Sequence, residues 1–203
     1  MAAYYAAFLD LRGRRALVVG GGDVAERKVS GLLDAGARVR VVSPRLTEAI
    51  AALAGVGIVE HRARVFRRPD VRGCVLVVAA TGVPDVDDEV AEAARRARAL
   101  VNVVDRAEAC DFILPSVLRR GDLQIAVSTG GQSPALAREI RRGLEHHFDE
   151  DCGAVIAWAG RARARVMGIA PTAAARLRAA ERVAAIALRR LAPSQAPVDT
   201  PAR

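Results

Sequence analysis

The chain has 203 residues, enough for one large or two small domains with a sizeable hydrophobic core. It carries 31 basic and 23 acidic residues, a net charge of +8, and Lys28 is its only lysine. Seven aromatic residues are too few for base-stacking platforms, and no uninterrupted basic run resembles a nucleic-acid-binding arm, so we expect no nucleic-acid partner. The preference for arginine can reflect a GC-rich genome, but guanidinium groups also bind carboxylates and phosphates well, which adds acidic small molecules to the candidate partners.

Three cysteines, Cys74, Cys110 and Cys152, are widely spaced and form no CxxC pair, which argues against a disulfide framework and a zinc site. The first residues, MAAYYAAFLDLRGRR, lack a basic region ahead of their apolar stretch and make a poor secretory signal. No apolar run reaches the length of about 18 residues that a membrane-spanning helix needs. We therefore expect a cytoplasmic protein with no membrane partner and no metal site.

Short β-branched runs alternate with amphipathic stretches over residues 14–106, the pattern of a parallel sheet covered by helices. Four strands are predicted, at residues 16–19, 39–42, 75–79 and 100–104, with a weaker candidate at 58–59. Helices are predicted at residues 24–35, ending at Gly36, and at residues 85–97, after Pro84. The predicted fold class is therefore α/β, with a Rossmann-type parallel sheet in this part of the chain.

The first predicted strand runs into a glycine turn and a helix start of the GxGxxA form. Gly20 permits the tight turn, Gly22 lets a pyrophosphate approach the backbone, and Ala25 allows the helix to pack closely. Amide groups in the first turn of the helix that follows would face the phosphates, with the helix dipole assisting. A glycine turn can also be purely structural, but the surrounding strands and helix favour a dinucleotide site.

At the end of the second strand, Ser43, Pro44 and Arg45 stand where an acid usually binds the ribose hydroxyls. On chemistry alone, Ser43 could bond a ribose hydroxyl and Arg45 could favour the extra phosphate of NADP. The alternative is a turn with a solvated Arg45. This position leaves the choice between NAD and NADP open.

Two further strand ends reach the same edge of the predicted sheet, where ligands bind in such folds. Thr81 and Gly82 follow the third strand and can offer a hydroxyl and backbone groups to a dinucleotide, or simply form a turn. Asp105 follows the fourth strand, where a carboxylate can act as a general base or orient a cationic group. Its alternative role is to cap the turn.

Beyond residue 106, strands are predicted at 112–114 and 123–127, on either side of a basic turn at 119–122. A helix follows from Ser133, as cap, and Pro134 to about residue 147, and residues 151–191 are helical with a break near 168–171.

The small-residue turn before the helix that starts at Pro134 is a second candidate anion site, although an ordinary helix cap would have the same sequence. Its candidate substrate-binding residues are Ser128, Thr129, Gly130, Ser133 and Arg138.

In combination these motifs resemble the precorrin-2 dehydrogenase/sirohydrochlorin ferrochelatase module of siroheme synthases. The resemblance extends over roughly residues 8 to 150 and lies in five segments in family order: VVGGGDVAERK at 18–28, AAT at 79–81, NVVD at 102–105, FILPS at 112–116 and AVSTGGQSP at 126–134. It implies an NAD-dependent oxidation of precorrin-2 to sirohydrochlorin. In bifunctional members, ferrous iron is then inserted to give siroheme.

The resemblance also implies site residues and a homodimer. The dinucleotide-contacting positions of the family correspond to Asp23, Val24, Pro44 and Arg45. The resemblance therefore favours a contact of Arg45 with NAD over one with the extra phosphate of NADP. Asp105 falls on the aspartate implicated in both reactions. Two positions depart from the family. Thr129 replaces a serine that can be phosphorylated in some bifunctional members, which puts that regulation in doubt, and Leu114 replaces a common methionine.

On this basis residues 1–112 are expected to form the NAD-binding Rossmann domain, 113–149 a small α+β dimerisation region, 150–191 a helical domain and 192–203 a disordered tail. The length leaves no room for the methyltransferase domain of fused siroheme synthases, so we expect either a stand-alone enzyme or a chain cut at a proline-rich linker. The alternative function is that of a regulatory Rossmann domain that senses NAD without catalysis.

Overall fold

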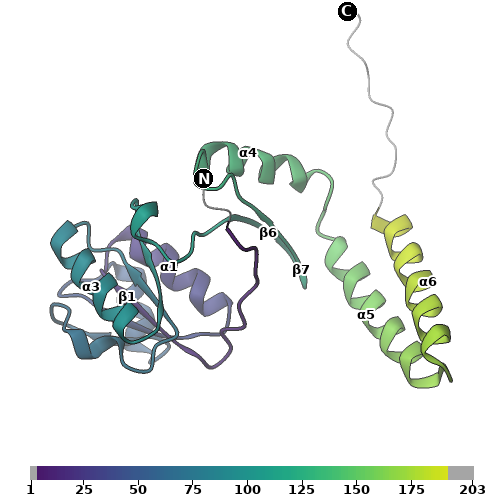
Figure 1. Cartoon of the computed structure of the whole chain (residues 1–203), viewed down its shortest axis with the longest axis horizontal. Coiled ribbons are helices and arrows are strands. Elements are labelled where there is room, and N and C mark those ends of the chain that lie inside the picture. The colour runs from purple at the N-terminus through teal and green to yellow at the C-terminus, as the bar shows by residue number, and fades with distance from the viewer. Residues whose placement is uncertain (1–3, 192–203) are drawn as a thin grey trace, which may run out of the picture. The chain divides into compact units, whose positions relative to one another are not determined.

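The computed structural model describes residues 4–191, so the tail predicted at 192–203 lies outside the described residues (Figure 1). The chain divides into two compact units, one ending at Ile113 and the other beginning at Leu114. Within residues 4–191 no helix is both long and apolar enough to cross a membrane.

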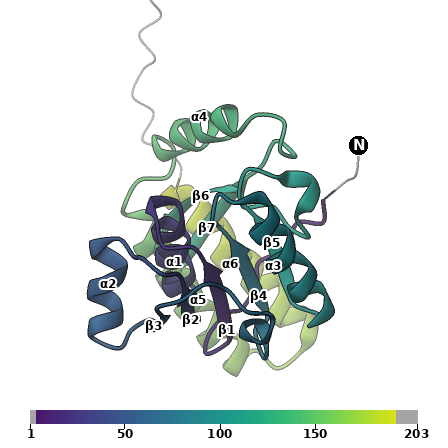
Figure 2. The same cartoon turned by 90° about the vertical axis from the view of Figure 1, so that its left-hand side faces the viewer.

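The first unit is built on a five-stranded parallel sheet. Its strands are β1 (Arg15–Val19), β2 (Arg38–Val42), β3 (Glu60–Arg62), β4 (Leu76–Ala79) and β5 (Leu100–Val103). They lie in the order β3-β2-β1-β4-β5, as Figure 2 shows from left to right. The strand order reverses between β1 and β4, the place where Rossmann-type sheets bind ligands. The predicted α/β fold class is confirmed.

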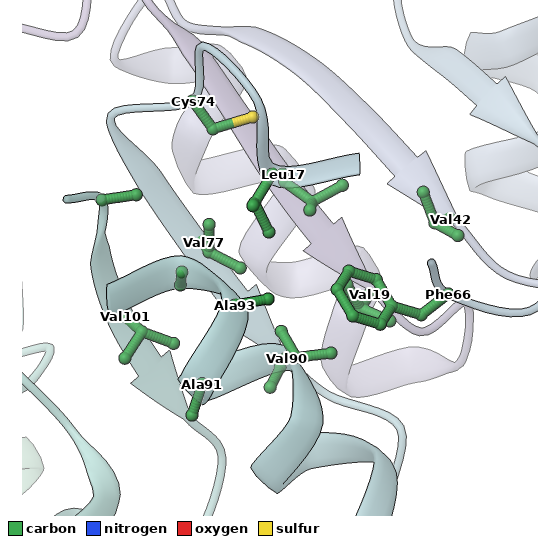
Figure 3. Close-up of a cluster of buried hydrophobic side chains, with 14 of the residues drawn as sticks. Leu17, Val19, Val42, Phe66, Cys74, Val77, Val90, Ala91, Ala93 and Val101 are labelled. Atoms are coloured by element: carbon green, nitrogen blue, oxygen red, sulfur yellow. The ribbon is translucent and has the colours of Figure 1, made fainter. Parts of the chain in front are cut away.

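Side chains of β1 point alternately to the two faces of the sheet. Leu17 and Val19 enter one buried cluster together with side chains of β4, β5 and α3 (Pro84–Arg96), part of which Figure 3 shows. Ala16 and Val18 enter a second cluster with α1 (Asp23–Asp34). Because helices cover both faces, β1 after Arg15 and all of β4 are continuous apolar runs rather than alternating ones.

The helix ends follow the predicted signals. α1 ends at Asp34, and Gly36, two residues further on, has φ +74° and donates its N–H to the carbonyl oxygen of Leu33 at 2.8 Å. α3 begins with Pro84 at its first position, has acidic residues in its first turn and Arg95 and Arg96 in its last, all favourable for the helix dipole.

The second unit combines a hairpin with three helices. The strands β6 (Ser116–Arg120) and β7 (Leu123–Val127) pair antiparallel, and the helices are α4 (Pro134–Glu145), α5 (Cys152–Ile169) and α6 (Ala173–Leu191). Leu118 of β6 is 1% exposed. α5 and α6 pack on each other, with the Arg190 guanidinium 4.2 Å from the centre of the Trp158 ring.

Four details differ from the sequence prediction. Residues 112–114 form no strand, because Phe112 packs against the sheet core and its carbonyl oxygen accepts a hydrogen bond from the Asn102 amide at 3.0 Å. β6 therefore begins only after Pro115. β3 lies at 60–62 rather than at 58–59, since its pairing with β2 rests on backbone hydrogen bonds and not on apolar side chains.

The other two differences concern a helix and a turn. The helix α2 (Glu48–Gly55), capped by the Thr47 hydroxyl, is absent from the prediction. The turn predicted at 119–122 is confined to Gly121 and Asp122, because the two preceding arginines belong to β6. Two 3-10 helices, Arg68–Val71 and Ala107–Ala109, complete the first unit.

Candidate dinucleotide-binding site

The turns that follow four parallel strands are joined at one edge of the sheet. Gly20, after β1, donates its N–H to the Val42 carbonyl of β2 at 3.0 Å. Ala80, after β4, donates to the Val19 carbonyl of β1 at 2.8 Å, and the next turn is linked in the same way, with Val104 donating to the Ala79 carbonyl at 3.0 Å. These bonds bring the predicted cofactor residues and Asp105 to the same edge.

The glycine turn is crowded on one side and open on the other. Gly20 has φ +123°, and a Cβ there would lie 2.2 Å from the carbonyl oxygen of Ala80. A Cβ on Gly21 would lie 2.0 Å from the carbonyl oxygen of Arg45, a close approach that the sequence analysis did not identify. A Cβ on Gly22 would meet nothing within 4 Å. The first two glycines let three loops meet, and the third borders open space.

The N-terminus of α1 adjoins that space. Gly22 is its cap residue, and no side chain accepts a hydrogen bond from the first turn, which contains Asp23 and Val24. Behind it, Ala25 is fully buried in the core, so the helix start sits close to β1. Unpaired amide groups at a helix start, together with the positive end of the helix dipole, suit a pyrophosphate. The residues present therefore fit a dinucleotide.

The loop after β2 is braced by Ser43 rather than left open. Ser43 is 8% exposed and donates its hydroxyl hydrogen to the carbonyl oxygen of Arg45 at 2.6 Å. The N–H of Thr47 donates to the carbonyl oxygen of Gly21 at 2.8 Å, which ties this loop to the glycine turn. Pro44 and the Arg45 side chain are exposed. Arg45 is thus the polar side chain of this loop that can reach a ligand, while Ser43 fixes the loop.

The turn after β4 is held by Thr81 in a similar way. Its hydroxyl donates to the Asp87 carboxylate at 2.7 Å and accepts the N–H of Val83 at 3.1 Å. Its own N–H lies 3.2 Å from the same carboxylate oxygen of Asp87, which is 4% exposed. Because the hydroxyl is occupied, Gly82 and the backbone are what this turn offers to a nucleotide.

Asp105 stands in an exposed turn directly after β5, with a left-handed backbone of φ +60°. Aspartate adopts this conformation more readily than most residues. The returning chain is fixed by Cys110, whose sulfur accepts the N–H of Val103 at 3.1 Å and lies 3.3 Å from the carbonyl oxygen of Arg106. Burial raises the pKa of the Cys110 thiol. Cys110 therefore fixes the end of the loop, while the Asp105 side chain on the loop is exposed to solvent.

Three residues at this edge were not predicted from the sequence: Gly21, Cys110 and Lys28. The Lys28 side chain is half-buried on α1, and burial and the adjacent Arg27 lower its pKa, whereas Asp105 raises it. One feature of the sequence could have drawn attention to this residue: Lys28 is the only lysine among 31 basic residues.

The candidate substrate residues lie in the second unit. Thr129 and Ser133 hold the turn before α4, since the Thr129 hydroxyl both donates to the Ser133 carbonyl and accepts the Ser133 N–H, each at 3.0 Å. The Ser133 hydroxyl caps α4 at the N–H of Leu136, as predicted. Ser128, Gly130 and Arg138 are exposed. Among residues 4–191, no group of three or more His, Cys, Asp or Glu side chains is placed to hold a metal ion.

Comparison with known proteins identifies both parts of the chain. The family model described as putative NAD(P)-binding matches residues 7–116, and the one described as sirohaem biosynthesis protein central matches residues 120–147. Siroheme synthase 1 of Aeromonas salmonicida (strain A449) is 45% identical over 163 residues, which cover 80% of this chain and 35% of that protein. The siroheme synthase of Thioalkalivibrio sulfidiphilus (strain HL-EbGR7) is 43% identical over 180 residues, or 89% and 37% of the two chains.

A solved structure, "SirC, precorrin-2 dehydrogenase", has a TM-score of 0.76 and 27% sequence identity over 90% of this chain and 89% of its own. The chain spans about a third of the length of the siroheme synthases that it matches. The NAD(P)-binding match alone extends over more than half of the chain. The chain belongs to the NAD(P)-binding family of siroheme biosynthesis proteins.

Proposed function

We propose that this protein oxidises precorrin-2 to sirohydrochlorin with NAD as the hydride acceptor. The observation that carries the proposal is the position of Asp105, whose exposed carboxylate lies at the same sheet edge as the open glycine turn. A regulatory nucleotide-binding domain has no need of a carboxylate there. The matching family and the likeness to a precorrin-2 dehydrogenase support the same reaction.

The cofactor contacts follow from the geometry of the edge. Amide groups of Asp23 and Val24, beside Gly22, would bind the pyrophosphate, and Gly20 keeps the turn tight enough for this approach. On the β2 side, Pro44 and Arg45 would line a ribose of the dinucleotide. On the β4 side, Gly82 and the backbone of Thr81 would line the other half of the dinucleotide. Bound NAD would supply the hydride acceptor of the reaction.

Asp105 would take the proton that leaves the substrate with the hydride. Dehydrogenation removes one hydride and one proton, and the proton needs an acceptor within hydrogen-bond reach of the reacting carbon or of a bridging water. An exposed carboxylate on an anchored loop can serve this purpose. Substrate binding would use the second unit, where the exposed Ser128 and Arg138 offer a hydroxyl group and a guanidinium to a macrocycle with carboxylate side chains, and Thr129 holds the turn between them.

Ferrous iron insertion into sirohydrochlorin is a separate part of the proposal. Pyrrole protons must leave as the metal enters, and the carboxylate that accepts a proton in the oxidation can accept them too. The test compares the rate of ferrous or cobaltous insertion with and without the protein. A rate equal to the spontaneous one would leave the protein as a dehydrogenase only.

We also propose that the protein is a homodimer that associates through the second unit. α4 buries Ala137 but leaves Leu136 52% and Ile140 44% exposed on an otherwise charged helix. Beside them is a cavity of about 350 Å³ with an apolar lining: Ile140, Gly143, Leu144, His147, Phe148 and Leu191. Exposed apolar side chains next to an apolar hollow are typical of a protein–protein contact.

The dehydrogenase proposal is tested by giving the purified protein precorrin-2 and NAD and following NADH absorbance. Formation of NADH in proportion to precorrin-2 is expected. Binding of NAD without NADH formation, by correctly folded protein, would refute the proposal and favour the NAD-sensing function. A parallel assay with NADP decides which dinucleotide is preferred.

A further inference from the structure

A buried carboxylate, that of Asp70, binds two arginines at the end of β3. Asp70 is 1% exposed, and its two oxygens accept hydrogen bonds from Arg64 at 2.6 and 2.8 Å. Arg62, the last residue of β3, donates to the same carboxylate at 2.5 Å, and the N–H of Arg67 donates at 2.9 Å. One carboxylate thus holds two guanidinium groups whose side chains are 34% and 30% exposed.

The two arginines lie beside the loop that would line a ribose of the dinucleotide. The carbonyl oxygen of Arg62 accepts the N–H of Ser43, which directly follows β2, at 3.2 Å, and that of Arg64 at 2.8 Å. The ring Nε2 of His61 lies 2.9 Å from the carbonyl oxygen of Ser43. The end of β3 is therefore bonded twice to the loop that carries Arg45.

The chain between Arg64 and Asp70 packs against the same end of the sheet. Phe66 is 9% exposed and belongs to one buried cluster with Val19 and Val42, the last residues of β1 and β2, as Figure 3 shows. The glycine turn and the loop after β2 begin directly after these two valines. Asp70 and the arginines that it binds therefore border the candidate dinucleotide site.

The chemistry of this border bears on the choice between the two dinucleotides. NADP differs from NAD by a phosphate on the 2′-hydroxyl of a ribose, and an arginine near that ribose can bind the phosphate. Burial would raise the pKa of Asp70, but hydrogen bonds, with those from Arg64 foremost, lower it to about 2. The carboxylate is therefore ionised at neutral pH, and it competes with a 2′-phosphate for the same guanidinium groups.

We propose that Asp70 is a specificity-determining residue, which keeps the site selective for NAD by binding the guanidinium groups of Arg62 and Arg64 that would otherwise meet the 2′-phosphate of NADP. This inference rests on the proposed function for the place of the dinucleotide, but not for the oxidation of precorrin-2. Measurements of dinucleotide binding therefore test it separately from catalysis.

The first test is calorimetric titration of the whole protein with NAD and with NADP at neutral pH. Asp70→Asn keeps the shape of the side chain and removes its charge, so that Arg62 and Arg64 become available to the phosphate. The dissociation constant for NADP should fall about tenfold, the effect of one added charge-assisted contact, and that for NAD should change less than about twofold. An unchanged ratio of the two constants would overturn the proposal.

A second pair of variants identifies the group that binds the phosphate. Adding Arg64→Gln to Asp70→Asn should remove most of the gain in NADP affinity, and a gain that survives intact would contradict the proposal. Arg64→Gln alone, which does not depend on the folding of Asp70→Asn, should weaken NADP binding less than about threefold, because Asp70 already holds this group and its remaining charge is screened by salt. A loss of about tenfold or more at unchanged NAD affinity would show that Arg64 already binds the phosphate, and would overturn the proposal.

The matched control is Asp10→Asn, which removes a carboxylate from an exposed pair with Arg12 and should leave both constants within about twofold. Equal gains in NADP affinity in Asp10→Asn and Asp70→Asn would mean that only net charge matters, which contradicts the proposal. If the original protein binds NAD but forms no NADH from precorrin-2, the proposed oxidation fails and the titrations still decide the role of Asp70. If it binds neither dinucleotide, both proposals are overturned.

Discussion

A Cβ atom on Gly20 would lie 2.2 Å from the carbonyl oxygen of Ala80, at the point where the turns after β1 and β4 meet. Gly20→Ala should therefore lower the free energy of unfolding by more than about 2 kcal/mol, because the turns must separate and the backbone is left-handed at this residue. Urea denaturation measures this loss. An unchanged midpoint would show that the turns can separate freely.

Gly22→Ala is the matched comparison, since a Cβ there meets nothing within 4 Å and φ is −88°. Stability should change by less than about 1 kcal/mol. NAD affinity should fall by about tenfold, or about 1.4 kcal/mol, because the methyl group would occupy space assigned to the pyrophosphate. Calorimetric titration measures the affinity, and equal affinity in both proteins would place the phosphates elsewhere.

Thr81 and Asp87 form the second structural pair of the site. Thr81→Val removes the hydroxyl bond to the Asp87 carboxylate, which is 4% exposed, and the bond from the Val83 N–H, and should cost about 2 kcal/mol of stability. Thr81→Ser retains the hydroxyl and should stay within about 1 kcal/mol of the original protein. Thermal unfolding of the two variants checks this, and equal stability would refute the role given to the hydroxyl.

The carboxylate of Asp70 should make the fold sensitive to acid. It is 1% exposed and accepts hydrogen bonds from Arg62 at 2.5 Å, from Arg64 at 2.6 Å and from the N–H of Arg67 at 2.9 Å. Burial alone would raise the pKa of Asp70, but these bonds, with Arg64 foremost, lower it from 3.8 to about 2. The paired carboxylate therefore stabilises the fold above pH 3.8, and this contribution is lost as the pH falls towards 2.

Asp70→Asn should lower the free energy of unfolding at neutral pH by about 2 kcal/mol and flatten its decline in acid. Asp10→Asn is the control, because hydrogen bonds from Arg12 also lower the pKa of Asp10 to about 2, but on an exposed pair that contributes little to stability. Urea titrations at several pH values compare the two. If both variants lose the same free energy of unfolding with the same pH dependence, the buried carboxylate of Asp70 contributes no more to stability than the exposed one of Asp10, which would contradict this prediction.

The apolar surface of α4 should decide the oligomeric state. Leu136→Glu combined with Ile140→Glu places two charges among the exposed apolar side chains and should give monomers, because burying unpaired charge opposes association. Arg142→Gln, on the charged side of the helix, should leave the dimer intact. Light scattering after gel filtration measures the mass. A double variant that stays dimeric would place the contact elsewhere.

Four strands of the central sheet were predictable because each is short, rich in β-branched apolar residues and largely buried. β1, β2, β4 and β5 begin and end within one residue of their predicted limits. β3 was misplaced because Glu60–Arg62 is polar and depends on β2 for its pairing. α2 escaped prediction because it is only eight residues long and, after Glu48, consists of apolar residues and glycine, so no polar face marks it as an amphipathic helix.

The site was predictable to the extent that its chemistry depends on residues adjacent in sequence. Gly20 and Gly22 indicate the turn by themselves, but the approach of Gly21 to the carbonyl oxygen of Arg45 joins segments far apart in the chain. The bracing roles of Ser43 and Thr81 likewise depend on hydrogen-bond partners that only the folded chain brings near.

In the proposed function, Asp105 serves catalysis and not cofactor binding. The most direct measurement is NADH formation from precorrin-2 and NAD by Asp105→Asn, with NAD affinity determined on the same sample. Asparagine keeps the shape and tolerates the left-handed backbone, so the variant should bind NAD as the original protein does. It should turn over at least about 100-fold more slowly, the usual effect of losing a general base. Turnover at the original rate would contradict the claim.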